Sequence, residues 1–407
     1  MTLALAVLGA TLIQMNAAYA YSDVPSSYWD YTAITYVAST NPWMQDYGAT
    51  TFKPTTGESR KYLARALVLA FKPSESIDPS IHFADLPDTD PYYKYANIAT
   101  KLGWMPKYKS GNWAPNGAVT VSLFDQAIIM AMGNLGTAIS GLQGIHRTGG
   151  TKYTVGTRFP YLILAHYLGL HYNHSDESLD LMASTAIRRD EVAYSLWKSK
   201  NLYSYLVPNA NTRYAKVELP ALDTGVQAQA DKAAVTQYAL NQVGFPYIWA
   251  GEWNKPSPSG YCCGTQLQGG FDCSGFVWWT VKKYEDGYNS AQYRSYPGWS
   301  LHERSSSQMA QYTTSPVTWG NLRIGDLMFF ASKGGSTYSD VDHVGIWLGN
   351  NWLIHSASSN DGVVLDYVAS GWYYDNFVYG RRLIGGGSSK ASLAAAPKAW
   401  LTMGDKK

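Results

Sequence analysis

One cysteine stands where a catalytic nucleophile would be expected. Cys273 lies in the sequence Phe-Asp-Cys-Ser-Gly-Phe at residues 271–276, after a Gly-rich loop and at the start of an apolar stretch that is typical of a helix. Unpaired N–H groups and the positive end of a helix stabilise a thiolate, so this position predicts a cysteine whose pKa is lowered. For a cysteine considered alone, a buried and inert side chain is the commoner explanation.

Two histidines supply the base that such a nucleophile requires, because the thiol proton must be taken up and later given to the departing amine. His343 opens one strand-like run and His355 lies in the next, which predicts a β-hairpin. A three-residue loop at 349–351 pairs Gly345 with His355 and puts both histidines on one face, whereas a two-residue loop puts them on opposite faces. We expect the first arrangement, with His343 as the base and His355 fixing its tautomer.

The cysteine count is consistent with a free thiol. The chain has three cysteines, and an odd number in an exported protein leaves at least one unpaired unless chains pair with one another. Cys262 and Cys263 are adjacent, which makes Cys273 the natural free thiol. We assign no catalytic role to the adjacent pair.

Four motifs in a fixed order relate the last part of the chain to a known family. Residues 228–382 resemble the NlpC-type papain-like cell-wall peptidases, with the family's landmarks at 245–251 (Phe-Pro-Tyr-Ile-Trp-Ala-Gly), 272–276 (Asp-Cys-Ser-Gly-Phe), 324–330 (Ile-Gly-Asp-Leu-Met-Phe-Phe) and 343–346 (His-Val-Gly-Ile), followed by Ile354 and His355. The resemblance implies an α+β papain-like domain with a Cys273–His343–His355 triad. It also implies cleavage of peptidoglycan stem peptides at the bond between γ-D-glutamyl and the diamino acid.

The same resemblance implies that Tyr247, Asp272 and Ser274 hold the N-terminal part of the substrate. A carboxylate suits a free L-alanyl ammonium there, because a charge-assisted hydrogen bond would select that end. Asp272 has a structural alternative as the N-cap of the following helix, and the two roles are compatible. The backbone N–H of Cys273 is the expected donor to the oxyanion of the tetrahedral intermediate.

The chain departs from the family pattern in two places. The usual Trp-Gly-Gly is Trp-Ala-Gly at residues 249–251, and an insertion at 252–271 separates it from Asp272. We expect the insertion to lie over the cleft, where it would narrow the substrate range or block access.

The first half of the chain contains a degenerate repeat. The first unit carries Asp23, a helix at 31–40, Phe52 and a second helix from Ser59. In the second unit Asp85 corresponds to Asp23 and Trp113 to Phe52 at nearly the same offset along the chain, with helices at 92–102 and 121–132. A third, worn unit has a helix at 159–170 and another that opens at Arg188.

These units resemble S-layer homology repeats, which implies an all-α, pseudo-threefold domain. In that family an arginine at a helix start helps to bind secondary cell-wall polysaccharide. The matching positions are Arg60 and Arg189, whereas the second unit has Val121 there. The alternative is that the two arginines only make surface contacts near helix starts.

Bulk properties favour an exported protein. The segment 1–20 is mostly apolar and ends in Ala18-Tyr19-Ala20, which predicts a secretory signal peptide. The apolar run is shorter than the roughly 20 residues that cross a bilayer, and no later segment qualifies as a membrane span. A net charge of +2 gives no reason to propose nucleic acid as a partner, while 32 Tyr and 15 Trp suit contact with sugars or wall polymers.

The chain of 407 residues is long enough for two or three domains. We expect a signal peptide at 1–20, three repeats at 21–205, a linker at 206–227, an NlpC-type peptidase domain at 228–384 and a disordered tail at 385–407. No cofactor or metal is expected, since His171 and His174, although near Asp176, fit an exposed loop better than a metal site.

The expected function is that of a secreted, cell-wall-associated cysteine endopeptidase that cleaves peptidoglycan stem peptides and is docked to the wall by its first half. Two other functions remain open. One is a wall-bound structural or adhesive protein whose peptidase domain is inactive or blocked. The other is an amidase or acyltransferase on the same scaffold.

Overall fold

The computed structural model describes residues 21–48, 50–150, 152–222, 226–256, 263–282, 301 and 303–385. The predicted signal peptide lies outside these residues, as does the predicted tail apart from Gly385. None of the helices in the described part of the chain is long and apolar enough to cross a membrane.

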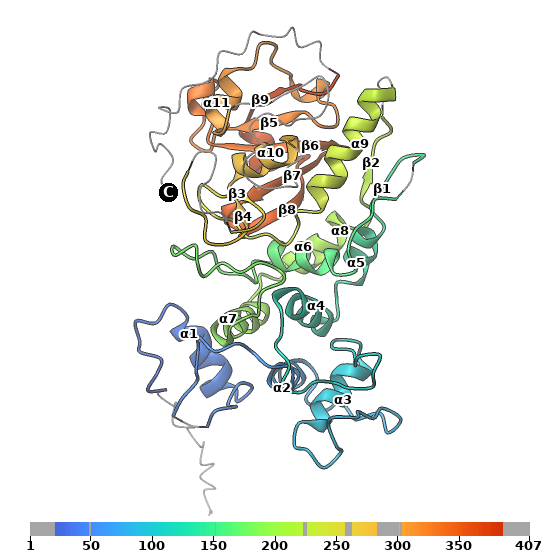
Figure 1. The fold of residues 1–407 in the computed structure, drawn as a ribbon, viewed down its shortest axis with the longest axis vertical. Coiled ribbons are helices and arrows are strands. Elements are labelled where there is room, and N and C mark those ends of the chain that lie inside the picture. The colour runs from blue at the N-terminus through green and yellow to red at the C-terminus, as the bar shows by residue number, and fades with distance from the viewer. Residues whose placement is uncertain are drawn as a thin grey trace, which may run out of the picture.

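The first half of the described chain is built mainly from helices, which form the lower part of the molecule in Figure 1. They are α1 (Tyr31–Ile34) with its π-helical continuation η1 (Thr35–Thr40), α2 (Arg60–Phe71), α3 (Tyr93–Lys101), α4 (Val121–Met132), α5 (Gly136–Gln143), α6 (Phe159–Tyr167) and α7 (Arg189–Lys200). Helices therefore occupy the positions at which the three repeats predict them. A two-residue strand, β1 (His146–Arg147), interrupts the series and pairs in parallel with β2 (Glu218–Leu219).

The first two units share a local turn. The carboxylate of Asp23 accepts hydrogen bonds from the backbone N–H groups of Phe52 and Lys53, at 2.9 and 2.7 Å. The carboxylate of Asp85 accepts them from Trp113 and the residue that follows it, at 2.7 and 2.8 Å. The spacing found in the sequence therefore corresponds to the same side-chain-to-backbone contact in both units.

The segments before α2, α4 and α7 are joined in a closed ring. Each segment forms one isolated antiparallel β-bridge with each of the other two: Gly57 with Arg188, Ser59 with Ala118, and Thr120 with Ala186. The starts of these three helices, one from each predicted unit, therefore meet in one place.

A buried carboxyl group near the start of α1 makes the stability of this half pH-dependent. Burial, together with the charges of Asp190 and Glu191, raises the pKa of Asp30 to about 9. A carboxyl whose pKa is raised on folding lowers the free energy of unfolding progressively as the pH rises, here between about pH 4 and pH 9.

We therefore expect Asp30→Asn to stabilise the protein at pH 8 by on the order of 2 kcal/mol and to have little effect at pH 4. Chemical denaturation followed by circular dichroism at both pH values measures this. Asp88→Asn, at an exposed position in the same half, is the control. An equal change at both pH values would contradict the assignment.

The segment predicted as an irregular linker is ordered where it is described. It contains α8 (Leu206–Arg213) and β2, and then α9 (Val226–Leu240) begins before the predicted boundary ends. Ala210, Tyr214 and Leu219 are fully buried. The linker prediction is wrong here because apolar side chains among Pro and Asn residues pack on both halves of the chain instead of facing solvent.

The second half contains a five-stranded antiparallel sheet in the order β8-β7-β6-β5-β9, as expected for the α+β domain (Figure 1). Its strands are β5 (Leu327–Phe330), β6 (His343–Gly349), β7 (Trp352–Ala357), β8 (Gly362–Tyr367) and β9 (Phe377–Arg381). The other elements are β3 (Glu252–Trp253), β4 (Gly270–Phe271), α10 (Cys273–Lys282), α11 (Ser306–Gln311), η3 (Trp319–Asn321), η4 (Tyr338–Asp340), η5 (Ser358–Asn360) and α12 (Trp372–Asp375).

Helix α10 packs against the middle of the sheet, on β6 and β7. Its apolar face is fully buried, with Phe276 and Trp278 among the largest buried side chains. At about 25 cal/mol per Å² of apolar surface, such side chains fix the helix firmly to the strands. The first residue of α10 is therefore held at a constant position over the sheet.

Candidate active site

Cys273 is the first residue of α10, and only Asp272 separates it from β4. Asp272 caps the helix, because its Oδ1 accepts hydrogen bonds from the backbone N–H of Gly275 at 2.6 Å and from the hydroxyl of Ser274 at 3.0 Å. The alternative suggested for Asp272, a helix N-cap, is thus confirmed. Cys273 is a free thiol, whereas Cys263 is disulfide-bonded and Cys262 lies outside the described residues.

The thiol of Cys273 lies against the backbone on both sides of His343. Its Sγ–H donates to the carbonyl oxygen of Asp342 at 4.0 Å, and the backbone N–H of Val344 donates to the sulfur. The helix start and the start of β6, far apart in sequence, therefore meet where the sequence analysis placed the nucleophile and its base.

The hairpin that carries both histidines differs in detail from its prediction. Its turn has two residues, Asn350 and Asn351, and both have positive φ angles, 49° and 63°, as a type I′ turn requires. The pairs on either side, Gly349 with Trp352 and Trp347 with Leu353, leave Leu348 as a bulge. The predicted three-residue loop is wrong. The extra residue in the bulge nevertheless gives the strands the pairing that a three-residue loop would have given, so each side chain points to the predicted face.

His343 and His355 consequently lie on one face of the sheet. His343 Nε2 and His355 Nδ1 are 2.8 Å apart, and the rings meet edge to face. The pairing of Ile346 with Ile354 places Gly345 beside His355, as predicted. A Cβ on Gly345 would lie 2.9 Å from the Cβ of His355, so only glycine leaves room for the two rings.

Two further side chains extend this pair, and the sequence analysis did not single them out. His355 Nε2 is 3.2 Å from Asp366 Oδ2 on β8, and Asp366 Oδ1 accepts a hydrogen bond from Arg213 Nη1 at 2.8 Å. Asp366 has no motif around it, and Arg213 lies far before His343 along the chain, in the predicted linker. Only the fold brings them to the site.

The protonation states of the two reacting groups follow from their burial. Burial, and then the charge of Asp272, raise the pKa of the Cys273 thiol to about 12. Burial and the neighbouring His355 hold the pKa of His343 well below its ordinary value. The predicted lowering of the cysteine pKa is wrong, because burial outweighs the helix terminus, so a neutral thiol faces a neutral imidazole.

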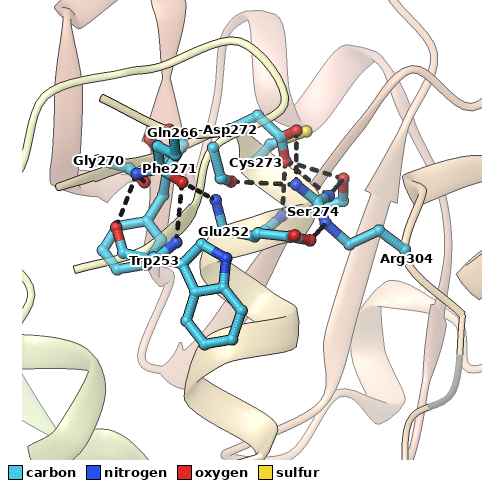
Figure 2. Close-up of polar contacts among 12 residues, drawn as sticks. Glu252, Trp253, Gln266, Gly270, Phe271, Asp272, Cys273, Ser274 and Arg304 are labelled. Atoms are coloured by element: carbon cyan, nitrogen blue, oxygen red, sulfur yellow. Dashed lines mark hydrogen bonds and ion pairs between the residues drawn. The ribbon is translucent and has the colours of Figure 1, made fainter. Parts of the chain in front are cut away.

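Arg304, also missed in the sequence, ties the residues around Cys273 together (Figure 2). Its guanidinium binds both carboxylate oxygens of Asp272, at 3.0 and 2.9 Å, and Glu252 at 2.8 Å. It also donates to the hydroxyl of Ser274 at 2.8 Å and to the carbonyl of Gly251 at 3.0 Å. The buried arginine thus compensates the buried carboxylate of Glu252 and the half-buried carboxylate of Asp272, and it holds the helix cap in place.

The three residues implied in substrate binding lie around the cysteine. Asp272 and Ser274 flank it, and Tyr247 is joined to Phe271 by an isolated parallel bridge. Burial raises the pKa of Tyr247 strongly, and the next largest causes are the charges of Cys273 and Asp272, so the three groups are close. Tyr373 on α12, which carries no motif, lies with its ring 4.8 Å from the ring of His355.

The insertion forms part of a groove. Strands β3 and β4 pair antiparallel, and the side chain of Gln266 binds backbone groups of both. The described part of the insertion, together with Trp249 and with Glu177 from the first half, lines a groove of about 210 Å³. Residues 257–262 of the insertion lie outside the described residues.

The two arginines proposed to bind wall polymer are buried. Arg60 donates to the carbonyls of Trp113 and Pro106, at 2.7 and 2.8 Å, and its guanidinium stacks over the Trp113 ring. Arg189 donates to the carbonyl of Phe52 at 3.0 Å and pairs with Glu58. The alternative of surface contacts is wrong, because each guanidinium is buried and links its own unit to another.

His174 is buried and His171 is half-buried, although an exposed loop was expected for both. His174 Nε2 is 2.6 Å from Glu191, and His171 Nε2 is 3.1 Å from Asp125. Among the described residues, no three His, Cys, Asp or Glu side chains are arranged to hold a metal ion.

Comparison with known proteins agrees with these features. Residues 244–382 match the NlpC/P60 family, and residues 20–56 match the S-layer homology domain. A "Probable endopeptidase" of Mycobacterium tuberculosis is 33% identical over 149 residues, which are 36% of this chain and 29% of that protein. The "Murein DD-endopeptidase MepH" of Escherichia coli K12 is 28% identical over 169 residues, 40% of this chain and 52% of that protein.

Among solved structures, an NlpC/P60 family protein from Bacillus cereus is similar over 40% of this chain and 41% of that one, at 25% identity and a TM-score of 0.28. The chain thus spans from less than a third to about half of the length of the relatives it matches. From the four motifs and the two family matches, the chain carries an NlpC/P60 domain at residues 244–382 and an S-layer homology domain at residues 20–56.

Proposed function

We propose that this protein is a secreted cysteine endopeptidase that hydrolyses peptidoglycan stem peptides. The observation that supports it most is the contact of the Cys273 thiol with the backbone on both sides of His343, whose ring is paired with His355. A nucleophile, a base and a group that orients the base are thereby within reach of one substrate carbonyl.

In the proposed reaction, His343 takes the thiol proton as the sulfur of Cys273 attacks the carbonyl of the scissile amide. The oxyanion of the tetrahedral intermediate is stabilised by the backbone N–H of Cys273. The protonated His343 then donates its proton to the departing amine, which leaves a thioester. Water, deprotonated by His343, hydrolyses the thioester and regenerates the thiol.

The proposed bond is the one between γ-D-glutamyl and the diamino acid, with Tyr247, Asp272 and Ser274 holding the residue before it. Asp272 precedes Cys273 directly in the chain, and its carboxylate is bound by Arg304. A carboxylate next to Cys273 supports recognition of a free L-alanyl ammonium.

The full chain incubated with an L-Ala-γ-D-Glu-diamino acid peptide, and separately with a D,D-cross-linked dimer of stem peptides, tests both the class of reaction and the bond. Mass spectrometry identifies the products, and Cys273→Ala is the control. Cleavage of the first peptide alone supports the proposed bond, and cleavage of the dimer alone replaces it with a D,D bond. No product from either would overturn the endopeptidase proposal in favour of a structural role or of another acyl-transfer reaction.

We further propose that residues 21–205 form a pseudo-threefold, S-layer-homology-like domain that docks the enzyme on secondary cell-wall polysaccharide. The equivalent turns at Asp23 and Asp85 and the closed ring of bridges support the three units. In this proposal Arg60 and Arg189 contribute to docking by holding the units together. Because both side chains are buried, any contact with the polymer would involve only the edges of their guanidinium groups.

Sedimentation of the full-length Cys273→Ala protein with purified walls tests the docking. We expect binding to intact walls and much weaker binding to walls from which the secondary polysaccharide has been stripped. Equal sedimentation with both preparations would show that the repeats do not recognise this polymer.

A further inference from the structure

We propose that Asp366 and Arg213 are positioning residues of the active site, which fix the tautomers of His355 and His343 so that the Nδ1 atom of His343 is left unprotonated towards Cys273. This inference rests on the proposed function and adds to it the device that prepares the base. It is carried by one continuous series of contacts: 2.8 Å from His343 to His355, 3.2 Å from His355 to Asp366, and 2.8 Å from Asp366 to Arg213.

The direction of every hydrogen bond follows from the chemistry of the last acceptor. An ionised carboxylate only accepts, so the Nε2 atom of His355 must carry a proton and donate it to Asp366. In a neutral imidazole the other nitrogen then accepts, so His355 Nδ1 receives a hydrogen bond from His343 Nε2–H. That leaves the lone pair of His343 Nδ1 free to take the thiol proton.

Asp366 is held in its ionised form by its partners. Burial alone would raise the pKa of Asp366, but the hydrogen bond from His355 and the charge and hydrogen bond of Arg213 lower the pKa below its ordinary value. Arg213 binds Oδ1 and His355 binds Oδ2, so the carboxylate is oriented as well as charged. When His343 becomes an imidazolium, this carboxylate compensates the charge through His355.

Arg213 comes from outside the matched family segment, which begins at residue 244. It is the last residue of α8, and the next residue, Tyr214, is fully buried and donates to the carbonyl of Leu365 at 2.8 Å. The rings of Tyr214 and Trp352 also stack, 5.8 Å apart. The helix is therefore fastened to β7 and β8, the strands that carry His355 and Asp366.

Among the described residues, we find no other charged group in contact with His343 or His355 that would set their tautomers. Cys273 contacts the backbone on both sides of His343 from α10. Tyr373 lies beside both histidines, with its ring 5.9 Å from that of His343 and 4.8 Å from that of His355. Burial raises the pKa of Tyr373 well above its ordinary value, so it stays neutral at working pH. Asp366 is thus the group that sets the proton positions.

Asp366→Asn is the decisive variant, because the amide offers its NH₂ group to His355 Nε2 and reverses the whole series. His355 would then donate from Nδ1, and His343 would carry its proton on Nδ1, where it cannot act as a base. We expect kcat/KM on the stem peptide to fall about 10³-fold, by analogy with a wrong base tautomer.

Two readouts do not depend on the substrate. In ¹⁵N-histidine NMR spectra of the full chain, His343 and His355 should both be Nε2–H tautomers in the wild type and Nδ1–H tautomers in Asp366→Asn. The rate at which iodoacetamide alkylates Cys273 below pH 9 should fall at least tenfold in the variant, because no base assists the thiol. Unchanged tautomers in a folded variant would overturn the proposal, whether or not the peptide is a substrate.

Variants of Arg213 test whether this residue has a positioning role or only a structural one. Arg213→Met should lower kcat/KM about tenfold and shift the acidic limb of the pH profile upwards, because Asp366 becomes easier to protonate. Arg213→Lys should restore most of the activity and the profile. Arg382→Met, which breaks an ion pair with Asp326 far from the triad, is the control and should leave the profile unchanged. A profile that stays unchanged in Arg213→Met would refute the part assigned to Arg213.

Discussion

Replacing either Cys273 or His343 by alanine is expected to lower kcat/KM on a stem peptide by about 10⁴-fold, and replacing both should cost little more than either change alone. In the proposed mechanism the two side chains perform one step together, so removing one leaves the other without a function. The buried thiol, with its pKa raised to about 12, is protonated at neutral pH and depends on the base for attack.

The two single variants should differ in their dependence on pH. In His343→Ala the residual rate should rise about tenfold per pH unit from pH 7 to pH 9.5, because only the small thiolate fraction reacts. The wild type should be nearly flat over this range, since His343 is already neutral. His82→Ala, at an exposed position, is the matched control. A flat profile for His343→Ala would mean that the resting sulfur is a thiolate.

Replacing Arg304 by methionine is expected to destabilise the peptidase domain by about 3–5 kcal/mol, the range for breaking a buried ion pair from one side. The change removes the guanidinium that binds the carboxylate of Glu252, which is buried, and that of Asp272, which is half-buried. A carboxylate needs this compensation only when it is ionised, so the loss of stability should grow as the pH increases from 4.5 to 8. Chemical denaturation at the two pH values measures it.

Charge and packing can be separated in the same experiment. If the loss comes from uncompensated charge, combining Arg304→Met with Asp272→Asn and Glu252→Gln should recover most of the stability. Arg304→Lys should recover only part of it, because one ammonium cannot bind two carboxylates in the forked geometry of a guanidinium. A triple variant as unstable as Arg304→Met would assign the loss to packing.

The placement of Cys273, His343 and His355 at one site could be predicted from sequence because each lies in a local pattern. A cysteine at a helix start and two strand-like runs need only short-range rules, and the parity argument then places His343 and His355 together. The bulge at Leu348 could not be predicted, since a two-residue turn with a bulge and a three-residue turn give the same alternation. The hypothesis was right about the face and wrong about the loop.

Other parts of the site depend on contacts that no local pattern encodes. Arg213, Arg304 and Asp366 stand in unremarkable segments, and only the packing of α8 and of the chain before α11 brings them to the triad. The prediction for the pKa of Cys273 failed for the same reason. A helix terminus is visible in sequence, but the depth of burial that outweighs it is a property of the folded chain.

The ring of bridges before α2, α4 and α7 affects how the first half of the chain can unfold. A linear array of repeats frays from its ends, because a terminal unit has one neighbour and can detach without disturbing the rest. In the ring each of the three segments has two partners. Opening one bridge leaves all three segments connected, and no segment can leave without breaking two bridges at once. We therefore expect partial unfolding from an end to be suppressed and the three segments to unfold in one cooperative transition.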